Sequence, residues 1–108
     1  GAAHGIGNAL MEELVYGDDG QLLSASFMDY LLPTALEMPP MVLEPFETLS
    51  PNNPLGVKGV GESGTIGALS SVANAVSDAI APLGARIPDV PLTPEKVWKA
   101  IKQASTKA

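Results

Sequence analysis

A glycine-rich stretch in the middle of the chain places the strongest constraint on the fold. Five glycines lie between residues 56 and 67, and they surround a single carboxylate, Glu62. Glycine lets the backbone approach a neighbour closely and take positive φ angles. The stretch opens into an apolar-periodic segment, and a helix start leaves unpaired N–H groups that favour anions. The pattern therefore predicts a cofactor site with a carboxylate base rather than a simple nucleotide cradle.

The glycine-rich stretch also admits simpler interpretations. Residues 59–64 formally match the dinucleotide-binding fingerprint, which needs a strong strand before it and a second strand after its helix. Pro54 and Gly56 interrupt the preceding strand, and a P-loop is excluded because Lys58 precedes the glycines. A tight turn with Glu62 solvated in the first helical turn is the structural alternative. The apolar neighbours favour a buried loop, in which a glutamate can act as a general base near neutral pH.

Hydrophobic periodicity predicts three helices. Apolar residues four apart predict a first helix over residues 6–16, which Gly17 would end. A longer apolar stripe predicts a second helix over residues 66–80. A third helix is expected to begin after Thr93, which is a favourable N-cap, with Pro94 at the first helical position.

Two further segments are predicted to be strands. Residues 21–32 alternate weakly, and residues 41–48 form a short apolar run in which Pro45 favours a sheet edge or a bulge. Three helices and two or three strands predict an α+β fold with a small mixed or antiparallel sheet. We expect residues 1–108 to form one small domain or a fragment of a larger one, because Gly1 lies inside what looks like a continuing motif.

Composition excludes several classes of function. The formal net charge of −6 argues against binding of nucleic acid or of anionic membranes. The absence of cysteine and the single histidine exclude thiolate, iron–sulfur and ordinary zinc or iron sites, so we expect no metal ligand from this chain. Any metal must be held by an organic cofactor. No apolar run reaches the roughly 18 residues of a membrane span, and no signal-peptide pattern is present.

Four segments, taken in order, resemble the molybdenum hydroxylase family. This family comprises the molybdopterin-binding large subunits of carbon monoxide dehydrogenase, aldehyde oxidase and xanthine dehydrogenase. The segments are Ala3-His4-Gly5-Ile6-Gly7-Asn8-Ala9-Leu10, Phe27-Met28-Asp29-Tyr30-Leu31-Leu32-Pro33-Thr34-Ala35, Gly59-Val60-Gly61-Glu62 and Ser71-Val72-Ala73-Asn74-Ala75-Val76. The resemblance covers nearly the whole chain and points to the carboxyl-terminal part of the molybdopterin-binding region.

The resemblance implies roles for particular residues. Glu62 would be the catalytic base that deprotonates a hydroxyl on the molybdenum, and Val60 and Gly61 would bring backbone amides near the cofactor. His4 and Gly5 would also contact the cofactor, although the family usually has glutamine where this chain has His4. The molybdenum of the family is held by the dithiolene of the pterin, so a chain without cysteine is consistent with it.

The resemblance also implies a cofactor, partners and a compartment. The cofactor would be molybdopterin, as the cytosine dinucleotide, and the location cytoplasmic. The partners would be the remainder of the large subunit and separate iron–sulfur and flavin subunits. We expect the chain alone to bind no cofactor tightly, to be inactive and to self-associate through exposed apolar surface. A non-catalytic interaction domain, including a degenerate split subunit, is the main alternative, and a nucleotide-binding module is a third.

Overall fold

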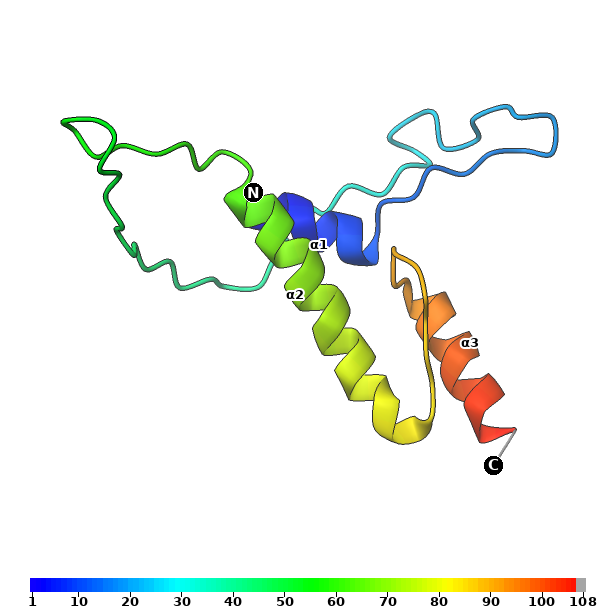
Figure 1. The fold of residues 1–108 in the computed structure, drawn as a ribbon. Helices are drawn as coiled ribbons and strands as arrows, with labels where there is room; N and C mark the ends of the chain where they lie inside the picture. Colours follow the sequence, from blue (N-terminus) through cyan, green and yellow to red (C-terminus); the bar gives the residue numbers. More distant parts are fainter. Residues whose placement is uncertain (107–108) are drawn as a thin grey trace.

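The computed structural model describes residues 1–106 and contains three α-helices joined by long irregular segments (Figure 1). Helix α1 spans Ala2–Leu10, and α2 spans Ser63–Ile80 and continues into a 3₁₀ turn, η1, at Ala81–Leu83. Helix α3 spans Pro94–Ser105. The segment between α1 and α2 forms two wide excursions that project away from the helices on opposite sides (Figure 1).

The first turns of α1 and α2 cross in direct backbone contact. A Cβ atom built on Gly5 would lie 2.5 Å from the carbonyl oxygen of Thr65 and 2.7 Å from the Cβ of Ala68. A Cβ atom on Gly64 would lie 3.0 Å from the backbone nitrogen of Ala2. Only glycine permits the approach at Gly5, whereas a side chain at Gly64 would have to displace its neighbour by a few tenths of an ångström. The crossing therefore fixes the start of α1 against the start of α2.

The expected start of α3 and the expected end of α2 are confirmed, whereas α2 begins at Ser63 instead of residue 66 and α1 is shorter than expected. The Thr93 hydroxyl accepts a hydrogen bond from the Lys96 amide at 3.3 Å, as an N-cap should. Gly84 follows η1 with a φ of 71°, a left-handed conformation that ends helices. Helix α1 does not reach Gly17 but ends at Leu10, because the chain turns sharply after it. The next two amides, at residues 11 and 12, both donate to the Gly7 carbonyl oxygen at 2.9 Å.

The predicted α+β fold is wrong, because the described residues contain no strand. In place of a strand, residues 21–32 make only one isolated antiparallel bridge, between Tyr16 and Leu22, followed by a turn. Residues 41–48 have no regular structure in the part of the chain that the structure describes. A strand needs a neighbouring strand to pair its backbone groups, and the described chain supplies none. The alternating residue types reflect a propensity for strand structure, but no second strand is present among the described residues to pair with these segments.

The chain is unusually open for its size. Its radius of gyration is 18.0 Å, whereas a compact domain of this length has about 13 Å. Its accessible surface is 8496 Å², about 2,800 Å² more than a compact monomer of the same mass exposes. The buried apolar residues are few, and two of the four are alanines: Ala9, Ile80, Ala85 and Leu92. A core of this size leaves most of the large apolar side chains in contact with solvent.

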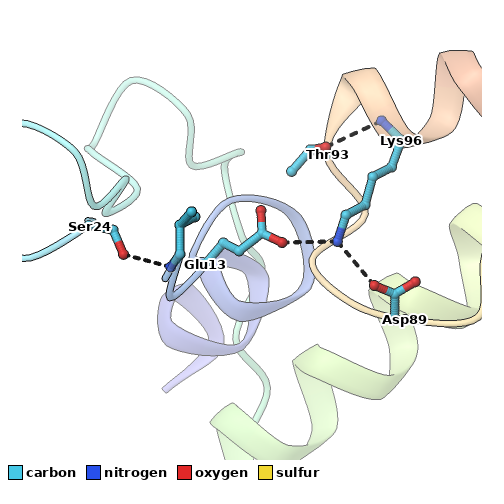
Figure 2. A network of polar contacts seen from close by, with 6 residues as sticks. Glu13, Ser24, Asp89, Thr93 and Lys96 are labelled. Carbon is cyan, nitrogen blue, oxygen red and sulfur yellow. Dashed lines mark hydrogen bonds and ion pairs between the residues drawn. The ribbon is translucent and has the colours of Figure 1, made fainter. Parts of the chain in front are cut away.

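A charged cluster joins the end of α1 to α3 and to the connector between α2 and α3 (Figure 2). Lys96 on α3 lies 3.2 Å from a Glu13 carboxylate oxygen and 3.2 Å from an Asp89 carboxylate oxygen. Burial alone would lower the pKa of Lys96, but its hydrogen bonds to Asp89 and Glu13 outweigh this effect and raise it. Nearby, the Leu92 amide donates to the Ala9 carbonyl oxygen at 2.6 Å. These contacts hold α3 close to the end of α1.

The expectation that no apolar run has the length of a membrane span is wrong for α2. The segment Ser63–Leu83, which comprises α2 and η1, is long and apolar enough to cross a membrane by length and composition alone, with a mean hydropathy of 1.3. A helix inside a larger soluble protein passes the same test. Its backbone contact with α1 shows that one of its faces packs against protein.

Candidate cofactor site

The glycine-rich loop is held at its base by one asparagine. Asn53 binds the backbone of Val57 from both sides, because its side-chain oxygen accepts from the Val57 amide at 3.1 Å and its NH₂ group donates to the Val57 carbonyl at 3.0 Å. The Ser50 amide also donates to the Gly56 carbonyl at 2.9 Å. These bonds close a short turn immediately before the loop. They fix the direction in which residues 58–62 enter α2.

Glu62 lies at the N-cap of α2. Its carbonyl oxygen accepts the Ile66 amide at 3.0 Å, while its side chain makes no capping hydrogen bond. The side chain is exposed and borders an open hollow together with Gly59, Val60, Gly61, Ser63 and Ile66. The structure thus brings three of the predicted site residues, Val60, Gly61 and Glu62, to one place. Glu62 is not buried by this chain, contrary to the expectation from its apolar neighbours.

Unpaired backbone donors gather around the same place. Among the described residues, the N–H groups of residues 58–62 donate to no backbone or side-chain acceptor. The first turn of α2 adds free N–H groups and the positive end of its helix dipole. Gly1 and Gly64 are in backbone contact, so the first turn of α1 packs beside this helix start. An anionic, hydrogen-bond-accepting group suits this donor set.

The two other predicted site residues are placed differently. Gly5 is buried in the crossing of α1 and α2, so its observed role is to let the helices approach. His4 precedes it in the first turn of α1 and is exposed, and its carbonyl oxygen accepts a hydrogen bond from the Asn8 side chain at 3.0 Å. Neither residue borders the hollow at Glu62. Both lie at the helix start that packs beside it.

Sequence reasoning missed a second carboxylate. Glu12 accepts a hydrogen bond from the Tyr30 hydroxyl at 2.6 Å. Its other carboxylate oxygen, Oε1, is buried and has no partner among the described residues. The hydrogen bond to Glu12, burial and the carboxylate charge together raise the pKa of Tyr30. The two residues are 18 positions apart, so no local pattern links them.

Comparison with known proteins identifies the relatives of this chain. Residues 1–39 match the family model described as the molybdopterin cofactor-binding domain. The chain is 49% identical over 100 residues to the gamma subunit of the 6-hydroxypseudooxynicotine dehydrogenase complex of Paenarthrobacter nicotinovorans. This match covers 90% of the present chain and 12% of that subunit. It is 38% identical over 103 residues to the carbon monoxide dehydrogenase large chain of Hydrogenophaga pseudoflava, with 95% of this chain and 13% of that one covered.

Solved structures give the same result. Quinoline 2-oxidoreductase from Pseudomonas putida 86 matches 94% of this chain with a TM-score of 0.89 and 45% identity, over 13% of its own chain. Carbon monoxide dehydrogenase from Oligotropha carboxidovorans matches 100% of this chain with a TM-score of 0.90 and 38% identity, again over 13% of its own. The chain thus spans about an eighth of the length of the relatives it matches. It belongs to the molybdenum hydroxylase family, and it corresponds to part of the molybdopterin-binding large subunit.

Proposed function

We propose that this chain forms one wall of the molybdopterin site in a molybdenum-dependent oxidoreductase and that Glu62 is the base of that site. The observation that carries the proposal is the position of Glu62. Its carboxylate makes no capping hydrogen bond and borders an open hollow. The backbone amides of residues 58–62 donate to no acceptor among the described residues. The start of α2 supplies the positive end that an anionic cofactor needs.

The residues present fit the chemistry of this cofactor. A molybdopterin carries an anionic phosphate, and the free N–H groups of residues 58–62 together with the start of α2 are donors of the kind that bind phosphate. The pterin holds its metal through its own sulfur atoms, and the described residues contain no cluster of His, Asp and Glu that could hold a metal ion. When bound, the cofactor supplies the two-electron redox chemistry that side chains lack. The proposed form is the cytosine dinucleotide.

Each residue of the site has a separate proposed role. Glu62 accepts a proton at its carboxylate from the reacting hydroxyl. The amides of Val60 and Gly61 donate hydrogen bonds to the cofactor, and the loop glycines leave room for it, since nothing lies within 4 Å of a Cβ built on Gly59 or Gly61. His4 lies where the family usually has glutamine. Its ring can donate a hydrogen bond from one nitrogen and accept a hydrogen bond at the other. The rest of the subunit would exclude water from Glu62.

The wider assignments are proposals as well. The relatives include proteins named carbon monoxide dehydrogenase, xanthine dehydrogenase and aldehyde oxidoreductase, so the substrate would be an aldehyde, a heterocycle or a molecule like carbon monoxide. Electrons would leave through iron–sulfur and flavin subunits, in a cytoplasmic enzyme. The described chain offers only one side of the hollow at Glu62. We therefore propose that it is inactive without the remaining part of the large subunit.

The test uses Glu62→Gln in the enzyme assembled from this chain, the remaining large subunit and its partner subunits. Turnover should fall by about 10² to 10⁴ with the molybdenum content unchanged, because the substitution removes the base and keeps the size of the side chain. Glu44→Gln is the matched control, since it removes the same charge from an exposed loop residue. Equal turnover in the two variants would reject Glu62 as the base. It would favour the alternative in which the chain is a non-catalytic interaction domain.

A further inference from the structure

An apolar groove lies between the three helices and shares no lining residue with the hollow at Glu62. It has a volume of about 820 Å³ and runs between α1, α2 and α3, with Leu31 from the first excursion at its edge. Its walls include the apolar side chains of Ile6, Leu10, Val76, Val97, Trp98 and Ile101. Trp98 is 58% exposed and Leu31 is 61% exposed, and most of the other walls are half-buried. Three separate helices thus direct apolar side chains into one open space.

The groove offers almost nothing to a polar ligand. Glu37 is its one charged lining residue, and the carboxylate of Glu37 already accepts hydrogen bonds from the Thr34 amide at 2.6 Å and from the Thr34 hydroxyl. These bonds lower the pKa of Glu37, so the carboxylate is internally satisfied and ionised. The Lys102 ammonium lies 4.8 Å above the Trp98 ring, outside the lining. Apolar side chains are therefore the chemistry that fits this surface.

Comparison with the relatives indicates what covers the groove. The open arrangement of the helices matches segments of solved large subunits with TM-scores of 0.89 and 0.90, and those subunits are about eight times longer than the matched segment. The excess accessible surface of about 2,800 Å² on this chain alone, if buried, would give an interface at the upper end of the range for obligate interfaces. The much longer chains contain the same open arrangement of helices. The rest of each chain can therefore stabilise this arrangement by packing against it.

We propose that the groove between α1, α2 and α3 binds an apolar segment of the remaining large subunit. The occupant inserts side chains between Val76, Trp98 and Ile101 and excludes water from them. This proposal rests on the proposed place of the chain within a large subunit, but it does not rest on the role of Glu62. The groove would be the contact that anchors the helices, while the glycine-rich loop faces the cofactor.

The test co-expresses the tagged 108-residue chain with the remaining part of the Hydrogenophaga pseudoflava large chain, that is, the subunit without its homologous segment. Ile101→Glu places a carboxylate in the groove, and Gln103→Glu places the same group on an exposed position of α3. Leu31→Glu and Leu32→Glu form a second pair outside the helices, in which only Leu31 lines the groove. Circular dichroism of each isolated variant checks that the helices persist.

The chain, Gln103→Glu and Leu32→Glu should copurify with the large-subunit partner in similar amounts. Ile101→Glu and Leu31→Glu should copurify at least about tenfold less, because a charge would be buried without a partner. Equal copurification within each pair, or no complex with the unaltered chain, would overturn the proposal. Acrylamide quenching of Trp98 gives a second readout: the large-subunit partner should protect Trp98 from quenching in the complex, and quenching that the bound partner leaves unchanged would also overturn the proposal. Glu62→Gln should copurify normally, so a failure of the catalytic proposal would leave this one intact.

Discussion

The crossing of α1 and α2 makes a quantitative prediction for Gly5→Ala. The added methyl group would lie 2.5 Å from the Thr65 carbonyl oxygen, about 0.9 Å short of the 3.4 Å at which ordinary contact begins, and 2.8 Å from the Leu69 amide nitrogen. Both are backbone atoms that cannot rotate away, so the overpacking cost falls at the upper end of its range, about 3 kcal/mol. Alanine recovers about 1 kcal/mol of helix propensity. The net loss is about 2 kcal/mol, or roughly 30-fold in the unfolding equilibrium.

Urea unfolding followed by circular dichroism and by Trp98 fluorescence measures this loss. Gly67→Ala is the matched control, because Gly67 lies in α2 with nothing within 4 Å of a built Cβ, and it should gain up to about 1 kcal/mol. The two variants should therefore move the urea midpoint in opposite directions. A Gly5→Ala chain that is as stable as Gly67→Ala would refute the close crossing of the helices.

Two further predictions concern contacts that join distant parts of the chain. The hydrogen bond to Glu12 raises the pKa of Tyr30 above the ordinary 10.0, so its stabilisation is complete below pH 10.0 and disappears as the pH rises through the raised pKa. Tyr30→Phe should remove that alkaline loss from a plot of unfolding free energy against pH, and an unchanged plot would contradict the assignment. Lys96→Met breaks the pairs with Glu13 and Asp89 and should cost about 1 kcal/mol at low salt, and less at high salt, in urea unfolding. A cost that does not depend on salt would show that packing, not charge, sets the role of Lys96.

Local signals in the sequence predicted the later helices well. The N-cap at Thr93, the proline after it and the glycine after η1 act on their immediate neighbours, so the sequence contains the whole cause. The glycine-rich loop before α2 was located for the same reason. The early end of α1 was not predicted, because residues 11–16 have apolar helical spacing but the chain turns after Leu10 instead.

The strands and the long-range contacts could not be predicted from local patterns. Residues 41–48 have strand propensity, but pairing depends on a neighbouring strand that the described chain does not provide. Lys96 and Glu13 are 83 positions apart, and only the folded chain shows that they meet. Burial of Glu62 was inferred from apolar neighbours, yet this chain leaves it exposed. In each case the deciding contact joins residues far apart in the sequence or is not made among the described residues.

The central claim is that Glu62 acts as a base at a molybdopterin site to which this chain contributes. The most direct measurement is the turnover rate per bound molybdenum in the assembled enzyme, compared between Glu62→Gln and Glu44→Gln. The account predicts a rate at least about 100-fold lower for Glu62→Gln, with the same molybdenum content in both variants. Equal rates per molybdenum would contradict it.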